Sequence, residues 1–189
     1  MILVRHGQSE FNVVYGKTRR DPGIRDPILT PLGWRQARYT AEYLAGCPIK
    51  RIICSPYRRA LQTAEIVASA FDVDFEINPD VGERAAFICD IGSVRSDLQK
   101  TWPDLRFDHI EEEWWPPLEE SEHALDQRCQ QFRRHMVENG DWANTLVITH
   151  WGFIRGLTGH QVGNCAVVRF DPSQVHPGGG HIVSTPDVC

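Results

Sequence analysis

The chain opens with the residues MILVRHGQSEFN (1–12), in which a short apolar run is followed at once by polar and charged side chains. A short apolar run that ends near a glycine predicts a buried strand, here over residues 1–5. Arg5 and His6 stand at the end of this strand, so both should lie at the carboxyl edge of a sheet. Gly7 has no Cβ, which lets the backbone beside His6 approach a bound ligand closely.

The same arrangement recurs near the other end of the chain, in the segment TLVITHWG (145–152). Residues 145–149 predict another buried strand, with His150 directly after it and a glycine two positions later. A third apolar run at residues 52–54 is followed closely by Arg59. Because ligands bind at the carboxyl ends of parallel strands, we expect the two histidines and two arginines to meet at one edge of the sheet.

Strands and helices alternate along the rest of the chain. The patterns predict further strands at 75–77, 166–170 and 181–184, and helices over 31–44, from 57, near 93–101, from 121 and over 152–159. This alternation predicts an α/β domain with a mainly parallel central sheet flanked by helices. We predict a single domain over residues 1–189, with an insertion or lid region at about 78–120.

Composition excludes several classes of protein. Hydrophobic residues make up 41% of the chain, enough for a core without disulfides or metals, and the formal net charge is −5. An acidic balance disfavours nucleic acid as a partner. Since no apolar run is long enough to span a bilayer and no signal peptide is evident, we expect a cytoplasmic protein with no membrane partner.

Metal and nucleotide motifs are also missing. The six cysteines form no C-x-x-C pair and the histidines form no H-E-x-x-H pattern, so we expect no metal and no cofactor. The cysteines are interpreted as reduced, small apolar residues. Gly16-Lys17-Thr18 matches the end of a P-loop, but Phe11 stands where that motif requires a glycine, so this segment is interpreted as an ordinary loop.

The predicted edge of the sheet combines a nucleophile with an anion site. Neutral imidazole attacks phosphorus well near neutral pH. Guanidinium groups present forked donors to phosphoryl oxygens and stabilise the charge that develops in the transition state. His6 and His150 with Arg5 and Arg59 therefore indicate phosphoryl transfer.

Four segments, in this order, resemble the histidine phosphatase superfamily in its phosphoglycerate-mutase-like branch. They read RHGQSEFN (5–12), DPILTPLGWRQA (26–37), SPYRRALQTAE (55–65) and VITHWGFIRGLTG (147–159). The resemblance implies a three-layer sandwich, in which His6 is the phosphorylated nucleophile and Arg5 and Arg59 bind the phosphoryl group. It also implies that His150 donates to the phosphoryl oxygens.

The resemblance assigns three further residues. Glu83 is the expected general acid, Asn12 is expected to contact the phosphoryl group, and Trp151 follows the second histidine where a small residue is common, so its indole should narrow the pocket. The segment after Glu83 differs from the usual family pattern. Asp80 and Asp90 are therefore alternative acids.

We predict a metal-independent phosphomonoesterase that hydrolyses a small phosphorylated substrate through a phosphohistidine on His6. A cofactor-dependent phosphoglycerate mutase and a non-catalytic phosphate-binding protein are the alternatives. The segment 104–122 is acidic and carries Trp114 and Trp115, which favours a leaving group other than phosphoglycerate.

Overall fold

The computed structural model describes residues 1–186 and contains one six-stranded sheet in the order β3-β2-β4-β1-β5-β6. The strands are β1 (Ile2–Arg5), β2 (Arg51–Cys54), β3 (Phe75–Ile77), β4 (Thr145–Thr149), β5 (Val167–Phe170) and β6 (Gly180–Ser184). Strands β3, β2, β4 and β1 are mutually parallel, whereas β5 is antiparallel to β1 and β6 is antiparallel to β5. The predicted mainly parallel sheet is confirmed.

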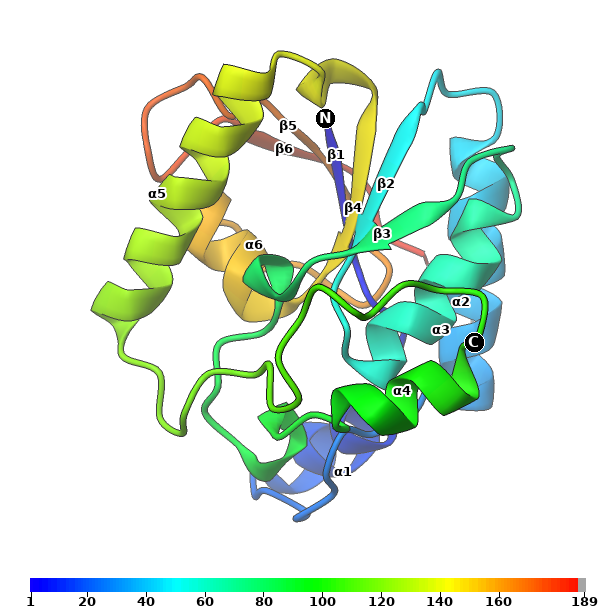
Figure 1. Ribbon diagram of the computed structural model, residues 1–189, viewed down its shortest axis with the longest axis vertical. Coiled ribbons are helices and arrows are strands. Elements are labelled where there is room, and N and C mark those ends of the chain that lie inside the picture. The colour runs from blue at the N-terminus through cyan, green and yellow to red at the C-terminus, as the bar shows by residue number, and fades with distance from the viewer. Residues whose placement is uncertain (187–189) are drawn as a thin grey trace.

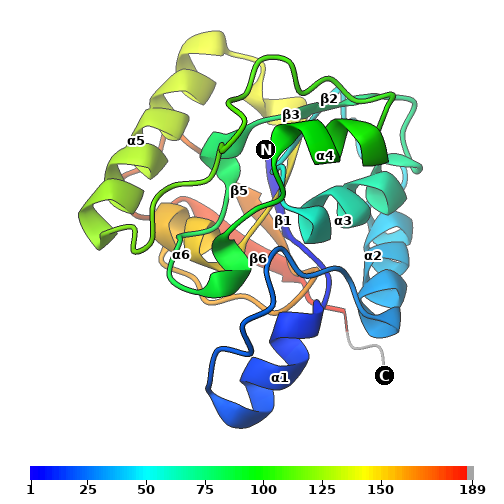
Figure 2. The ribbon, with the colours of Figure 1, turned by 60° about the horizontal axis from the view of Figure 1, so that its bottom comes forward.

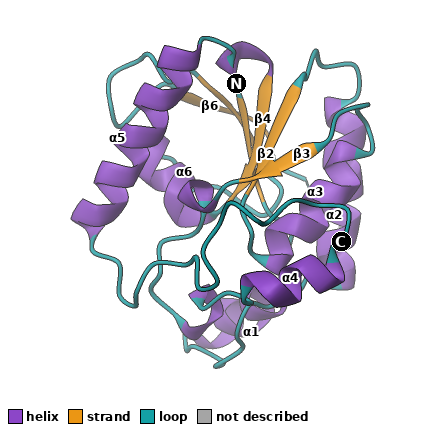
Figure 3. Cartoon of the chain, in the orientation of Figure 1, coloured by secondary structure: helices purple, strands orange, loops and turns teal. Residues whose placement is uncertain are grey.

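Helices cover both faces of the sheet, which gives the predicted three layers (Figures 1 and 3). One face carries α2 (Pro31–Leu44), α3 (Arg58–Ala68) and α4 (Arg95–Thr101), and the other carries α5 (Glu122–Asn139) and α6 (Trp151–Thr158). Helix α1 (Glu10–Thr18) projects beyond the carboxyl end of β1 (Figure 2). Three short 3-10 turns complete the elements: η1 (Pro79–Val81), η2 (Ile88–Asp90) and η3 (Trp142–Asn144).

Alternating side chains of the central strands divide the core into two halves. Successive residues of a strand point to opposite faces. Accordingly, Val4 and Ile52 join the cluster beneath α3, while Leu3 and Ile53 join the cluster beneath α5 and α6. All five residues of β4 are buried, as expected for the middle of a sheet covered on both faces.

Two of the predicted helices, α2 and α5, begin with a side-chain cap. Thr30 Oγ1 accepts a hydrogen bond from the Gly33 amide at 3.1 Å, and a proline occupies the first position of α2. Ser121 Oγ accepts from the Ala124 amide at 3.1 Å at the start of α5. Each cap satisfies an amide that would otherwise lack a partner in the first turn.

The interpretation of Gly16-Lys17-Thr18 as a loop is wrong, because these residues form the last turn of α1. Glycine costs about 1 kcal/mol within a helix, but tertiary packing overrides this propensity. The ring of Phe11 stacks on that of Tyr15, one turn further along α1, with centroids 5.0 Å apart. The helix ends at Arg19, whose φ of 55° is left-handed.

The irregular segment 78–120 contributes to the main core. Trp102, Phe107, Ile110 and Trp114 are buried in the cluster beneath α3. This burial ties the segment to the sheet on the α3 side, while its first part runs past the carboxyl ends of the strands.

Other features of residues 1–186 bear on the expectations from composition. No helix in this range is long and apolar enough to cross a membrane. Cys54, Cys89, Cys129 and Cys165 are buried, and neither they nor the half-buried Cys47 form a disulfide. Cys189 lies outside the described residues.

Candidate active site

A cavity of about 830 Å³ lies at the carboxyl ends of β1 and β4, where the sequence predicted a site. It is lined by six of the seven predicted site residues: Arg5, His6, Asn12, Arg59, Glu83 and Trp151. The seventh, His150, is fully buried behind His6, with the two ring centroids 5.1 Å apart. The strand register explains this proximity. Arg5 of β1 pairs with Thr149 of β4, and His6 and His150 are the residues that directly follow them.

His6 is oriented by its own backbone neighbour. Its Nδ1 lies 2.7 Å from the Gly7 carbonyl oxygen. A carbonyl only accepts, so Nδ1 carries the proton and the neutral ring keeps its lone pair on Nε2. Burial, together with the charges of Arg59 and Arg5, holds the pKa of His6 well below its ordinary value of 6.5. The imidazole is therefore neutral and nucleophilic at neutral pH.

Gly7 has a different role from the one that the sequence indicated. A Cβ at this position would lie 2.6 Å from the Gly33 carbonyl oxygen, so the glycine allows a close approach to the first turn of α2. The Gly7 amide donates to Thr63 Oγ1 of α3 at 3.1 Å. The glycine fixes the loop that carries His6 against two helices.

His150 is held by a hydroxyl group on the neighbouring strand end. Its Nε2 lies 2.8 Å from Ser55 Oγ, while its buried Nδ1 has no hydrogen-bond partner among the described residues. Burial and the charge of Arg59 hold the pKa of His150 well below 6.5. When Ser55 donates to Nε2, the neutral ring presents Nδ1–H as an unused donor.

The two arginines differ in burial, since Arg5 is half-buried and Arg59 is buried. Arg5 donates from Nη1 to the Val162 carbonyl at 2.8 Å, and its buried Nε is without a partner within residues 1–186. Burial lowers the pKa of Arg5 to about 10, so the group stays protonated at neutral pH. Arg59 is 3% exposed and pairs with Asp90 at 3.1 Å. Burial opposes its charge, but the charge of Asp90 and those of other neighbouring groups together raise the pKa of Arg59.

Glu83 is anchored by backbone amides on the far side of the cavity. Its Oε1 accepts from the amides of Arg84 at 2.9 Å and Gly152 at 2.7 Å. Burial, followed by the negative charge of Asp90, raises the pKa of Glu83 above its ordinary value of 4.5. A Cβ at position 152 would collide with Glu83 Oε1, which explains the glycine after His150.

The two alternative acids are placed differently. Asp80 is exposed and does not line the cavity. Asp90 does line it, but its Oδ1 faces Arg59 and its Oδ2 accepts from the amides of Ala86 and Phe87. Of the three carboxylates, Glu83 is the one in the cavity that no arginine side chain binds directly.

The remaining predicted residues, Asn12 and Trp151, also line the cavity. Asn12 Oδ1 accepts from the Ser9 amide at 3.0 Å and from Asn164 Nδ2 at 3.1 Å. Trp151 is half-buried, and the guanidinium of Arg155 lies 5.4 Å from its ring centroid. By contrast, Trp114 packs its ring against Tyr57 in the core, at 4.7 Å between centroids.

Sequence reasoning missed the role of Asp90 as the partner of Arg59, and it missed Asn164 and Arg155 as residues of the cavity. Asn164 also donates to the His6 carbonyl at 3.2 Å, from 158 positions away. Such a contact leaves no local pattern. Arg155 could have been found, because it lies one helical turn after Trp151 on α6.

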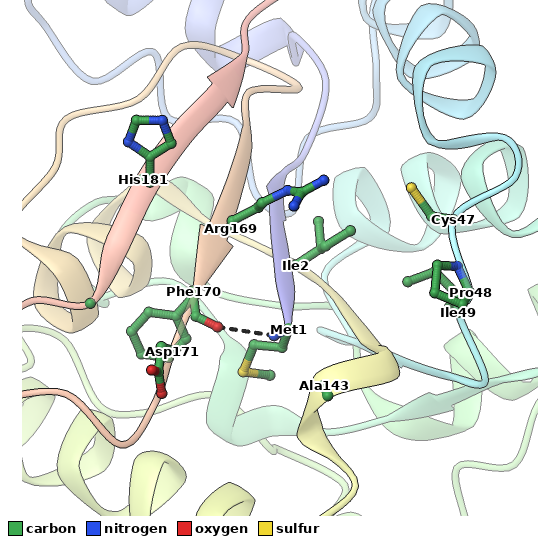
Figure 4. A pocket seen from close by; sticks show the side chains of 11 residues that line it. Met1, Ile2, Cys47, Pro48, Ile49, Ala143, Arg169, Phe170, Asp171 and His181 are labelled. Carbon is green, nitrogen blue, oxygen red and sulfur yellow. Dashed lines mark hydrogen bonds between the residues drawn. The ribbon is translucent and has the colours of Figure 1, made fainter.

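A second cavity, of about 390 Å³, lies at the opposite end of the sheet, around the start of β1 (Figure 4). Met1, Ile2, Pro48 and Phe170 contribute apolar surface to it, and the Met1 amine donates to the Phe170 carbonyl at 2.9 Å. None of the predicted site residues lines this cavity. Within residues 1–186, no group of three or more histidine, cysteine, aspartate or glutamate side chains is arranged to hold a metal ion.

Comparison with known proteins agrees with this geometry. A model of the histidine phosphatase superfamily (branch 1) matches residues 1–183. The 2,3-bisphosphoglycerate-dependent phosphoglycerate mutase of Thermoplasma acidophilum is 42% identical over 73 residues, which are 39% of this chain and 35% of that protein. The probable phosphoglycerate mutase GpmB of Enterobacter sp. (strain 638) is 28% identical over 183 residues, covering 89% of this chain and 83% of that protein.

Solved structures share the fold at low identity. A mycobacterial glucosyl-3-phosphoglycerate phosphatase in complex with VO3 aligns with a TM-score of 0.65 and 20% identity, over 100% of this chain and 97% of that one. The ecdysone phosphate phosphatase of Bombyx mori, in complex with tungstate, aligns with a TM-score of 0.67 and 17% identity, over 100% and 94% of the two chains. The matches to the first three curated relatives span only 35%, 36% and 40% of the lengths of those proteins.

Proposed function

This chain belongs to the histidine phosphatase superfamily, and on that premise we propose that it is a phosphomonoesterase that works through a phosphohistidine on His6. One observation carries the proposal. His6 is buried and neutral, with Nδ1 engaged by Gly7 and with two arginines beside it in one cavity. A neutral imidazole with a free Nε2 among fixed guanidinium groups is suited to attack a phosphoryl group.

In the first step, Arg5, Arg59 and His150 bind the phosphoryl oxygens while His6 Nε2 attacks phosphorus. The nitrogen–phosphorus bond forms as the bond between phosphorus and the leaving oxygen breaks. The unused Arg5 Nε and His150 Nδ1 are buried donors suited to those oxygens. Fixed donors of this kind stabilise the transition state without reorganising.

Proton transfer is assigned to Glu83. Its raised pKa keeps a share of the carboxyl protonated, so it donates a proton to the departing oxygen. The carboxylate then takes a proton from a water molecule, which attacks the phosphohistidine and releases inorganic phosphate. The second step restores both neutral His6 and protonated Glu83.

A phosphoglycerate mutase is the second candidate, because both curated relatives described above carry that name. A mutase must keep water away from the phosphohistidine and return the phosphoryl group to a second hydroxyl. Release of inorganic phosphate at the rate of substrate loss supports the phosphatase. Conversion of 3-phosphoglycerate to 2-phosphoglycerate without phosphate release would support the mutase.

The proposal is tested by replacing the nucleophile. His6→Ala should lower p-nitrophenyl phosphate hydrolysis by at least about 1,000-fold, since about 4 kcal/mol of barrier lowering is lost with the covalent route. His135→Ala, a matched change at an exposed position of α5, should have no effect. Rapid acid-free quenching should trap a phosphoenzyme in the wild type and none in His6→Ala. Activity of His6→Ala within about tenfold of the wild type would refute the mechanism.

A further inference from the structure

The cavity is larger than a phosphoryl group requires. Its volume of about 830 Å³ falls in the range of about 300–1,000 Å³ that holds ligands of drug or nucleoside size. The groups assigned to the phosphoryl oxygens occupy only the end nearest β1 and β4. Most of the remaining space must therefore receive the leaving group.

Three aromatic rings line one wall of this space. Phe11 and Tyr15 lie one turn apart on α1, and Phe87 precedes η2. The centroid of the Phe87 ring lies 5.4 Å from that of Phe11 and 5.1 Å from that of Tyr15. We call these three residues the aromatic subsite. Phe11 is only 9% exposed and packs beneath the other two rings, whereas Tyr15 and Phe87 are half-buried and present the ring surface on which a further planar ring can pack.

The aromatic subsite is fixed to the catalytic residues on both sides. Phe11 precedes Asn12. The Oδ1 atom of Asn12 accepts a hydrogen bond from Asn164 Nδ2, which also donates to the His6 carbonyl. Phe87 donates its amide to Asp90, which pairs with Arg59. Asn12 and Asn164 line the same cavity, and side-chain amides are suited to bind hydroxyl groups.

The rim beside these rings is positively charged. The guanidinium of Arg19 lies 5.8 Å from the Tyr15 ring centroid. Among the ion pairs of the described residues, Arg84 is neutralised by Glu122 at 2.9 Å, but neither Arg19 nor Arg155 has a carboxylate partner. A guanidinium over a ring extends the flat surface and attracts an anionic substrate to the cavity.

We propose that the aromatic subsite binds a planar heteroaromatic ring of the leaving group, so that the substrates are nucleoside-type phosphomonoesters. Such a molecule places its phosphate at His6, its hydroxylated sugar near Asn12 and Asn164, and its base against Tyr15 and Phe87. The inference rests on the proposed phosphatase function and narrows it to one class of substrate.

A matched pair of substrates isolates the ring. Adenosine 5′-monophosphate and ribose 5-phosphate release the same kind of primary alkoxide, and only the first carries a base. Stacking of one base on aromatic side chains predicts that kcat/KM for the nucleotide exceeds that for ribose 5-phosphate by about 10- to 100-fold. Tyr15→Leu and Phe87→Leu should remove most of this preference by raising KM for the nucleotide, and should leave ribose 5-phosphate within about twofold.

Tyr39→Leu is the matched control, because Tyr39 is 41% exposed on α2 and does not line the cavity. It should retain the full preference for the nucleotide. Thermal unfolding of each variant shows whether it is folded. A preference for ribose 5-phosphate, or equal losses on both substrates in a folded Tyr15→Leu protein, would overturn the inference.

Binding to an inactive protein separates this inference from the proposed function. Calorimetric titration of His6→Ala should give a Kd for adenosine 5′-monophosphate about 10- to 100-fold below that for ribose 5-phosphate, whatever the chemistry of turnover. Equal affinities, or binding of neither compound, would reject the aromatic subsite. If His6→Ala still hydrolyses p-nitrophenyl phosphate but prefers the nucleotide, the phosphohistidine mechanism fails and the subsite stands.

Discussion

Asp90 links the positive and acidic halves of the site. Its Oδ1 pairs with Arg59, and its Oδ2 accepts two amides of the segment that carries Glu83. Its charge raises the pKa of Arg59, and after burial it is the largest cause of the raised pKa of Glu83. One buried carboxylate therefore positions Arg59, which we propose binds the phosphoryl group, and favours the protonated form of Glu83, the proposed general acid.

Glu83→Gln should separate good from poor leaving groups. An alkoxide needs a proton to depart, so hydrolysis of an alkyl phosphate should fall by about 10²–10⁴-fold. Nitrophenolate departs without one, so p-nitrophenyl phosphate should lose much less in the phosphorylation step. Burst kinetics measures that step apart from attack by water, in which Glu83 also takes part.

Asp80→Asn is the control for this experiment, since Asp80 is exposed and outside the cavity. It should leave both substrates unchanged. Equal losses on the two substrates in Glu83→Gln, or no loss on either, would remove Glu83 from the role. A selective loss in Asp80→Asn would transfer the role to that residue.

Asp90→Asn should change the pH dependence of the reaction. Glu83 donates its proton, so kcat/KM falls as pH rises through its pKa. Because the charge of Asp90 raises that pKa, the neutral amide should move this alkaline limb to lower pH. The measurement is kcat/KM for an alkyl phosphate against pH. An unchanged limb with a raised KM would show that Asp90 acts on Arg59 alone.

The sequence predicted the site residues that follow strands. It did not predict contacts between residues that lie far apart along the chain. Arg5, His6 and His150 stand at strand ends, where topology alone brings them together. The pairing of Arg59 with Asp90 joins α3 to a 3-10 turn across an irregular segment. No periodicity encodes that contact, and Asp90 was considered only as a substitute acid.

At the scale of elements, α1 shows where local propensity misleads. Gly16-Lys17-Thr18 has the composition of a loop, yet it is the last turn of a helix held by Phe11 and Tyr15. The other helices and the strands were predicted to within about one or two residues, because their apolar patterns are local, and the caps Thr30 and Ser121 mark the starts of α2 and α5. Helix α1 lacks such a prediction because its packing partner, Phe87, is distant in sequence.

Gly16→Ala should therefore stabilise the protein. A Cβ at position 16 would meet no atom within 4 Å, so alanine fits without strain. In a helix, this change contributes about 0.5–1 kcal/mol. For a chain of this size, that raises Tm by about 1–4 °C in thermal unfolding followed by circular dichroism.

The matched control for this change is Gly140→Ala. Gly140 ends α5 with a φ of 73°, where alanine is strained, so Tm should fall. An unchanged or lower Tm in Gly16→Ala would contradict the helical conformation of residues 10–18.

Considered as a whole, the molecule carries a positive cavity in an acidic chain. The formal net charge is −5, yet five arginines line the cavity beside three carboxylates, and two of those carboxylates pair with arginines. Composition gave the overall sign of the charge and disfavoured nucleic acid as a partner. It could not place the arginines, because their grouping depends on the order of the strands in the sheet.

This grouping predicts the response to chelators. Many phosphatases stabilise phosphoryl transfer with bound metal ions. Here we assign that charge stabilisation to Arg5 and Arg59, whose guanidinium groups are held by Val162, Cys89 and Asp90. Treatment with EDTA should therefore leave kcat/KM for p-nitrophenyl phosphate unchanged, while a metal-dependent phosphatase in the same assay loses activity.

Arg59→Lys tests directly whether the guanidinium group of Arg59 stabilises the charge of the transition state. A lysine keeps the positive charge but lacks the planar fork that donates to Asp90, Cys89 and phosphoryl oxygens together. Hydrogen bonds that involve charged groups contribute about 1.5–3 kcal/mol, so kcat/KM should fall by about 10- to 100-fold. Arg58→Lys, at the preceding position of α3, is the matched control and should be unaffected. Loss of wild-type activity in EDTA that a divalent ion restores, or full activity of Arg59→Lys, would show that the guanidinium of Arg59 does not supply the stabilising charge.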